Sequence, residues 1–136
     1  MIQVFFNMRG SGKTKALINL ANEKAEGCKG NVVYIDDDER PMLQLSRKIR
    51  FIATNGFDLD DYNSFYGFLC GILSEDYDVD TIFIDGLSNI VSGNIIDAAH
   101  LFCDLEHITE ERGVNMYINV NSEDKAIPEF MKKYVA

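Results

Sequence analysis

The chain has 136 residues, of which 46% are hydrophobic, and its formal net charge is −9. This length suits one domain with one core, and we expect residues 1–136 to form a single domain. The acidic balance disfavours nucleic acid as a partner, because a duplex-binding surface normally needs a basic stripe. The longest apolar run, roughly Phe65 to Leu73, is about half the ~20 residues that a membrane-spanning helix needs.

Short apolar runs alternate with helical patterns, which predicts a three-layer α/β/α domain on a mainly parallel five-stranded sheet. The expected strands are Ile2–Phe6, Asn31–Asp36, Ile49–Ala53, Thr81–Asp85 and Met116–Val120. The expected helices run from Lys13 to about Glu26, from Pro41 to about Lys48, from Asp60 or Asp61 to about Ser74, from Ser92 or Asn94 to about Arg112, and onward from Pro128.

Two of these helices have distinctive apolar patterns. The helix that begins near Asp61 is apolar nearly all round, so we expect neighbouring elements to cover it well. The longest helix has an apolar stripe that predicts its inner face. The members of this stripe are Ile95, Ala98, Ala99, Phe102, Leu105 and Ile108.

The three cysteines, Cys28, Cys70 and Cys103, lack CxxC spacing, and no secretion signal opens the chain. Reduced thiols fit this pattern better than a disulfide framework or a zinc site. We therefore expect a cytoplasmic protein without a membrane partner. Cys70 and Cys103 stand in apolar stretches, which predicts that they fill the core.

A phosphate-binding loop is predicted between the first strand and the first helix. The loop comprises Asn7, Met8, Arg9, Gly10, Ser11, Gly12, Lys13 and Thr14. Except at its first residue it follows the Walker A pattern GxxxxGK[ST], in which backbone N–H groups and the helix N-terminus surround phosphates. We expect Lys13 to reach the outer phosphates and the Thr14 hydroxyl to ligate Mg²⁺. Asn7 replaces the first glycine of the pattern, and asparagine tolerates left-handed backbone angles better than other non-glycine residues.

Carboxylates end two of the expected strands. Asp85 ends one of them, and in phosphate-loop proteins such an aspartate holds Mg²⁺ through its water shell. Gly86 follows, where many ATPases place the glutamate that activates water, so the base lies elsewhere or hydrolysis is slow. The run Asp36–Glu39 follows another strand, and ligands collect at the carboxyl ends of parallel strands. We expect one of its four carboxylates to polarise the attacking water, the alternative for each being a solvated turn.

Other polar residues are candidates for contacts with the terminal phosphate. Asn119 and Asn121 end the fifth strand and could sense this phosphate, although ordinary loop hydrogen bonding is the alternative. Arg9 lies inside the loop and could touch phosphate, and Arg50 and Arg112 are the candidates for an arginine that stabilises charge.

The order of elements resembles the ATPase core of the RecA-like family within the additional-strand phosphate-loop ATPases. The resemblance covers nearly the whole chain, from Val4 to about Asn121, and rests on four segments. These are Gly12-Lys13-Thr14, the strand end Tyr34–Asp38, the strand Val79–Asp85 and the finish Asn119-Val120-Asn121. In that family the second strand ends in hydrophobic-Asp-x-Glu, and the glutamate activates water. The resemblance carries this role to Asp38, with Glu39 beside it, and the shorter aspartate implies slow hydrolysis.

The resemblance also implies a strand order of third, second, fourth, fifth, first. Ile2–Phe6 would then be an edge strand, and an exposed apolar edge invites a second copy of the chain or a protein partner. In kinases and GTPases the Asp85 strand would instead touch Ile2–Phe6 directly. The chain is also similar to small bacterial phosphate-loop proteins, some of them labelled twitching-motility ATPases, although that motor's histidine motifs have no counterpart here.

Three functions fit these patterns. The first is a slow Mg²⁺-dependent ATPase or ATP-dependent switch, and the second is a small-molecule or nucleoside kinase. The third is a non-hydrolysing module that reports ATP to a partner. Kinases usually carry an arginine-rich lid, and no such insertion occurs here. No [NT]KxD motif for reading guanine occurs either, which favours ATP over GTP.

Overall fold

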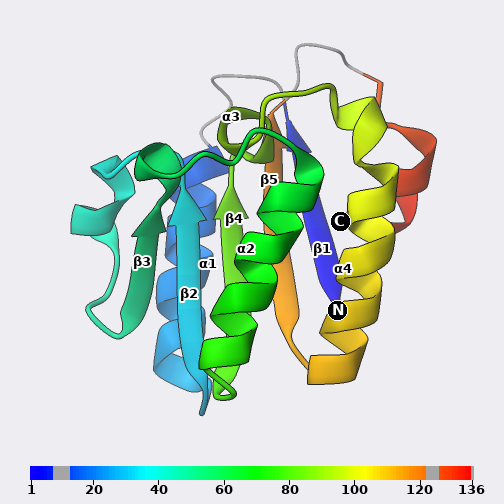
Figure 1. The fold of residues 1–136 in the computed structure, drawn as a ribbon. Coiled ribbons are helices and arrows are strands. Elements are labelled where there is room, and N and C mark those ends of the chain that lie inside the picture. The colour runs from blue at the N-terminus through cyan, green and yellow to red at the C-terminus, as the bar shows by residue number, and fades with distance from the viewer. Residues whose placement is uncertain (8–12, 122–125, 136) are drawn as a thin grey trace.

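The protein is built on a sheet of five parallel strands (Figure 1). The computed structural model describes residues 1–7, 13–121 and 126–135. The strands are β1 (Ile2–Asn7), β2 (Asn31–Asp36), β3 (Ile49–Ala53), β4 (Val79–Asp85) and β5 (Asn115–Asn121). They lie in the order β1-β5-β4-β2-β3, and every neighbouring pair is parallel. The expected α/β class with a parallel five-stranded sheet is confirmed, and β4 begins two residues before the expected Thr81.

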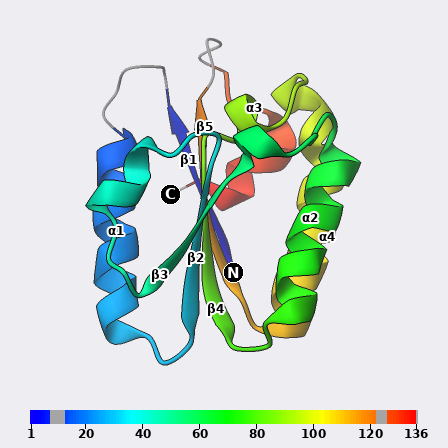
Figure 2. The ribbon, with the colours of Figure 1, turned by 60° about the vertical axis from the view of Figure 1, so that its left-hand side comes forward.

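Helices cover both faces of the sheet. The helices are α1 (Lys13–Gly27), α2 (Tyr62–Glu75), α3 (Leu87–Ile90) and α4 (Ala99–Arg112), and the 3₁₀ turns are η1 (Arg40–Gln44), η2 (Thr54–Gly56), η3 (Ile95–Ala98) and η4 (Glu129–Tyr134). Figure 2 shows α1 on one face of the sheet and α2 and α4 on the other. Among the helices of the described ranges, none is both long and apolar enough to cross a bilayer.

The sheet face beneath α1 carries a row of four aromatic rings, one on each of four adjacent strands. Phe51, Tyr34, Phe83 and Tyr117 follow one another across β3, β2, β4 and β5 in register. Their successive ring centroids are 6.2, 6.0 and 5.0 Å apart and their planes are nearly parallel, which is the offset stacking that aromatic rings favour. The rings therefore pack side by side on the sheet face that α1 covers.

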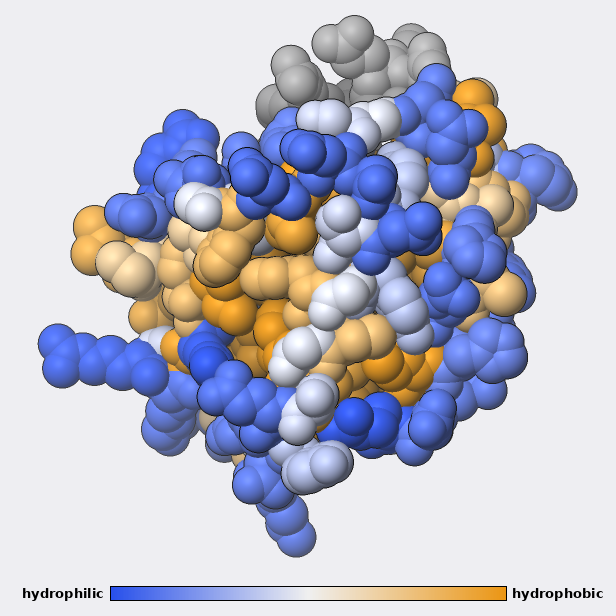
Figure 3. All heavy atoms as spheres, in the orientation of Figure 1, coloured by the Kyte–Doolittle hydropathy of each residue, from blue (hydrophilic) through white to orange (hydrophobic). Residues whose placement is uncertain are grey.

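The opposite face forms the larger core with α2 and α4. Asp61 caps α2 as expected, because its carboxylate accepts a hydrogen bond from the Ser64 N–H at 2.7 Å. One side of α2 is buried, but Tyr66 and Phe68 are only half-buried, so the helix is covered less completely than expected. Its buried residues are Phe65, Leu69, Ile72 and Leu73. Apolar side chains also gather in the left and central part of the face in Figure 3, over the β2–β3 side of the sheet.

The expected long helix from Ser92 or Asn94 begins later than the sequence predicts. Asn94 caps η3 instead, since its side-chain oxygen accepts a hydrogen bond from the Ile96 N–H at 3.1 Å. Local side-chain bonds of this kind compete with helix formation. The α-helix then starts at Ala99, which is exposed rather than part of the inner face.

The buried face of α4 is also rotated from the expected stripe. Leu101, Phe102, Leu105 and Thr109 are buried there. Cys103 follows Leu101 by two residues, about 200° around the helix, and it is exposed. The prediction that Cys103 fills the core is therefore wrong. The helix expected from Pro41 to Lys48 is also shorter than predicted. It is the 3₁₀ turn η1, which ends at Gln44.

β1 is an edge strand of the sheet, but its edge is not fully open. The chain's last segment crosses it, and Val135 forms a parallel bridge with Val4. Met131, in η4, is fully buried, and the Tyr134 hydroxyl donates to Glu106 on α4 at 2.8 Å. The expectation of an exposed β1 edge is thus wrong at Val4, and a partner at this edge would have to displace Val135. Such a partner stays a prediction.

We predict that Gly30→Ala destabilises the fold. A Cβ atom at this position would lie 2.5 Å from the backbone oxygen of Asp78 and 2.7 Å from the Cβ of Asp80. Because a backbone atom cannot move away cheaply, overpacking should lower the free energy of unfolding by about 1–3 kcal/mol. Urea denaturation measures this loss.

Gly67→Ala is the matched control for this test. A Cβ at this position in α2 meets nothing within 4 Å, so alanine should raise stability by about 1 kcal/mol through helix propensity. Equal midpoints for Gly30→Ala and wild type would contradict the close approach between the β2 and β4 starts.

Candidate functional site

A cavity of about 300 Å³ lies at the carboxyl ends of β2 and β4, next to the start of α1. Four carboxylates line it, and they are Asp36, Asp37, Asp38 and Asp85. Neutral polar residues line it as well, including Thr14, Gln44, Asn89 and Asn121. The carboxyl ends of parallel strands are the common place for ligands in open α/β sheets, so this cavity is the candidate site.

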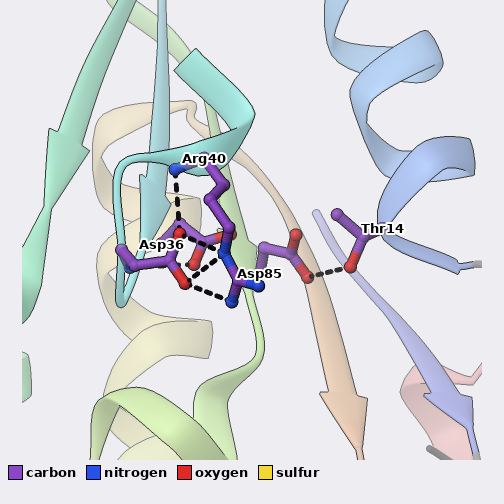
Figure 4. Close-up of polar contacts among 5 residues, drawn as sticks. Thr14, Asp36, Arg40 and Asp85 are labelled. Atoms are coloured by element: carbon purple, nitrogen blue, oxygen red, sulfur yellow. Dashed lines mark hydrogen bonds and ion pairs between the residues drawn. The ribbon is translucent and has the colours of Figure 1, made fainter. Parts of the chain in front are cut away.

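Asp85 is the centre of the hydrogen-bond network in the cavity, and only 3% of the residue is exposed. The Thr14 hydroxyl lies 3.4 Å from its Oδ1 atom, as Figure 4 shows, and the Asn119 side-chain amide donates to the same atom at 3.0 Å. The Tyr34 hydroxyl donates to Oδ2, also at 3.0 Å. The structure therefore brings together Thr14 and Asp85, the two residues expected to hold a metal.

Tyr34 keeps the proton with which it makes this bond. Burial, and next the charge and hydrogen bond of Asp85, raise the pKa of the Tyr34 hydroxyl far above its ordinary value. The hydroxyl therefore acts as a permanent donor to the carboxylate.

Gly86 turns the chain directly after Asp85. Its φ is 76°, in the left-handed region that favours glycine, and its N–H donates to the backbone oxygen of Asn119 at 3.0 Å. The Ser88 hydroxyl donates to the backbone oxygen of Asn121 at 2.8 Å. The end of β5 and the start of α3 are thus tied together, and backbone geometry explains why glycine stands at residue 86.

Asp36 is buried at the end of β2, on the same side of the sheet as Asp85. Burial raises the pKa of the Asp36 carboxyl to about 8, helped by a hydrogen bond with Asp37 and by the charge of Asp85, while the Asp38 N–H lowers it. Asp36 therefore holds a proton at neutral pH when no cation is near. A bound cation would favour its ionised form.

Asp38 lines the cavity but is held by a neighbour. Its carboxylate accepts a hydrogen bond from the Arg40 N–H at 2.8 Å and from Arg40 Nε at 2.9 Å. The Arg40 side chain, more than the backbone bond, holds the pKa of Asp38 below its ordinary value. Glu39 is exposed and precedes η1, outside the set of residues that line the cavity.

Arg40 and Tyr34 were not among the site residues predicted from the sequence. The arginine candidates Arg50 and Arg112 have structural partners instead. Arg50 lies 3.8 Å from Glu75, and Arg112 donates to the Leu73 backbone oxygen. Arg40 directly follows the acidic run, which is the signal that could have identified it.

The phosphate-binding loop falls largely outside the described residues. The loop residues outside the described ranges are Met8, Arg9, Gly10, Ser11 and Gly12. The structure also describes no side chain for Asn7 or Lys13. Their expected roles stay predictions. Asn121, expected near the terminal phosphate, does line the cavity.

The residues of the cavity suit a hard cation. Thr14 and Asp85 offer hydroxyl and carboxylate oxygens, the ligand types that Mg²⁺ prefers. In Asp36, Asp37 and Asp38, one ligand atom from each lies within 4.8 Å of the others. Oxygen donors from α1, β2 and β4 therefore surround one space.

A comparison with models of known protein families found no match, and a comparison with curated proteins found none either. Function is therefore inferred from the residues of the cavity and from the sheet that positions them.

The raised pKa of Asp36 predicts a pH dependence of stability in metal-free buffer. Between about pH 4 and pH 8 the folded protein keeps the proton on Asp36, while the unfolded chain has lost it. The free energy of unfolding should therefore fall as pH rises through this range. Asp36→Asn should flatten the fall, as measured by urea denaturation at pH 5 and pH 8.

Asp38→Asn is the control for this experiment. Because the pKa of Asp38 is lowered, its contribution to stability is lost only as pH drops below its ordinary range, and the slope from pH 5 to pH 8 should stay as in wild type. An equal slope for Asp36→Asn and wild type would show that Asp36 ionises normally in the folded state.

Proposed function

We propose that this protein binds ATP with Mg²⁺ in the cavity beside α1 and acts as a slow Mg²⁺-dependent ATPase or a nucleotide-dependent switch. The contact between Thr14 and Asp85 carries the proposal. These residues are 71 positions apart, yet the hydroxyl that follows Gly12-Lys13 lies 3.4 Å from the carboxylate that ends β4. In phosphate-loop proteins this pair of residues holds the metal ion that accompanies the nucleotide.

The position of β5 supports a RecA-like arrangement over that of kinases and GTPases. β5 lies between β1 and β4, pairing with both. This matches the order of third, second, fourth, fifth, first that the resemblance implies. In the kinase–GTPase branch the strand that ends in Asp85 would instead lie directly beside β1.

The charges in the cavity support a cation as part of the ligand. Four carboxylates line a space that would also receive the negative phosphates of ATP. Such charges repel one another at short range unless cations lie between them. Mg²⁺, when bound, would neutralise charge on the phosphate oxygens. In the proposed site Thr14 and Asp85 hold the metal, and Lys13 binds the outer phosphates.

Asp38 is the residue that we propose to orient the attacking water. It lines the cavity at the end of β2, where the RecA-like resemblance places this role. Its ion pair with Arg40 stabilises the ionised carboxylate and lowers its pKa, which weakens Asp38 as a base and fits slow hydrolysis.

The same ion pair favours a second candidate function. If Asp38 stays bound to Arg40 when ATP binds, the carboxylate that we propose to orient the attacking water is not free to do so. The protein would then hold ATP without hydrolysing it and would report its presence to a partner. Gly86, which has no side chain where many ATPases have a glutamate, favours this alternative as well.

Thermal melting with and without nucleotide tests the binding proposal. A ligand at about 100 times its Kd stabilises the folded state by ~2.7 kcal/mol, so MgATP should raise the Tm of wild type by roughly 10 °C. Lys13→Ala should lose this shift, and GTP should produce a smaller one. Lys15→Ala, a change at an exposed site on the same helix, should retain it. Millimolar MgATP without effect on wild type would overturn the proposal.

Phosphate release separates the two candidate functions. We expect wild type to release phosphate from MgATP more slowly than about 1 s⁻¹, the low end for such enzymes. Asp38→Asn should lower this rate by about 100-fold while it preserves the melting shift. Glu39→Gln should keep the wild-type rate, because Glu39 does not line the cavity. A melting shift without phosphate release from wild type would favour the non-hydrolysing module.

A further inference from the structure

The hydroxyl of Tyr34 is not needed by the aromatic row in which its ring lies. The Tyr34 ring is fully buried between Phe51 and Phe83, and both of these neighbours are phenylalanines. A ring without a hydroxyl would stack equally well at this place. The polar atom of Tyr34 must therefore be explained by what it contacts.

The Tyr34 hydroxyl contacts Asp85 because of the strand register. Tyr34 pairs with Phe83 across β2 and β4, so Asp85 lies two residues further along β4 and on the same face. The long side chain of Tyr34 spans this offset, and its hydroxyl lies 3.0 Å from Oδ2 of Asp85. The two phenylalanine neighbours hold the ring in the direction that this bond requires.

Asp85 is held from the strands on both sides of β4. Tyr34 donates to Oδ2 from β2, and the Asn119 amide donates to Oδ1 from β5. Because donors hold both oxygens, the plane of the carboxylate is defined. The lone pairs that these donors leave open remain available to the cavity, where Thr14 is the third contact.

We propose that Tyr34 is a positioning residue that orients the Asp85 carboxylate for Mg²⁺. This inference rests on the proposed binding of a magnesium–nucleotide complex. Hydrogen bonds to the ligands of a metal fix their orientation, and loss of such a bond typically weakens metal affinity by about 10–100-fold. Tyr34 itself is too deeply buried beneath α1 to touch the nucleotide, so it acts through Asp85.

Tyr34→Phe removes the hydroxyl and keeps the ring. The matched control is Tyr117→Phe, because Tyr117 lies in the same row on β5 and stacks on Phe83 at 5.0 Å. The described hydrogen bonds of Asp85 involve Thr14, Tyr34, Asn119 and Asp36, and Tyr117 is not among these partners, so Tyr117→Phe should leave the carboxylate in place.

The experiment is a titration of MgCl₂ into each variant at a saturating concentration of adenylyl imidodiphosphate, a non-hydrolysable ATP analogue, followed by thermal melting or calorimetry. Tyr34→Phe should raise the half-saturating Mg²⁺ concentration by about 10-fold or more. Tyr117→Phe should match wild type. Without Mg²⁺ all three proteins should bind the analogue equally, which a general loss of structure would not produce.

A second variant keeps the test decisive if Tyr34→Phe fails to fold. Asn119→Leu removes the donor to the other Asp85 oxygen with little change in volume, and it should also raise the Mg²⁺ requirement. The same half-saturating Mg²⁺ concentration in Tyr34→Phe and Tyr117→Phe would overturn the inference while the proposed function stands. Failure of wild type to bind the analogue with Mg²⁺ would overturn the proposed function as well.

Discussion

The carboxylate of Asp85 is almost completely buried, and the polar side chains around it are arranged to meet this constraint. A buried charge is costly unless hydrogen-bond donors or a cation surround it. Donors reach Asp85 from α1, β2 and β5, through Thr14, Tyr34 and Asn119. Their convergence requires β4 to lie between β2 and β5, as it does. The strand order, the aromatic row and the start of α1 are thus linked through one side chain.

The cavity around Asp85 is unbalanced in charge. Its described lining contains four carboxylates and one guanidinium, that of Arg40, which is engaged with Asp38. Asp36 responds by holding a proton, since its burial beside another carboxylate makes ionisation unfavourable. In the protein without ligand this proton lessens the repulsion at the carboxyl ends of β2 and β4, but the other carboxylates of the cavity still repel one another. Ligands that bring positive charge relieve this repulsion, and anions alone increase it.

Local features of the structure could be predicted from the sequence, whereas features set by distant contacts could not. The strands are apolar runs and the α2 cap is an aspartate before a helical pattern, so both follow from short-range chemistry. The exposure of Ala99 and Cys103 depends on how α4 is rotated, which is set by the packing of its buried residues against the sheet. The bond from Tyr34 to Asp85 depends on register between strands, and the cover over β1 depends on Val135. Neither the hydrogen bond nor the bridge can be predicted from a short window of sequence.

Gly86 limits where this fold can gain a stronger catalytic base. Any other residue there would adopt a left-handed φ at a cost of about 1–2 kcal/mol, and its Cβ would lie 3.1 Å from the side-chain amide of Asn89. A glutamate introduced beside Asp85, in imitation of faster ATPases, would therefore strain the corner that joins β4 to α3. The turn after β2 has no such restriction. For the proposed ATPase activity, attempts to engineer higher turnover should therefore vary residues 37–39 and leave residue 86 unchanged.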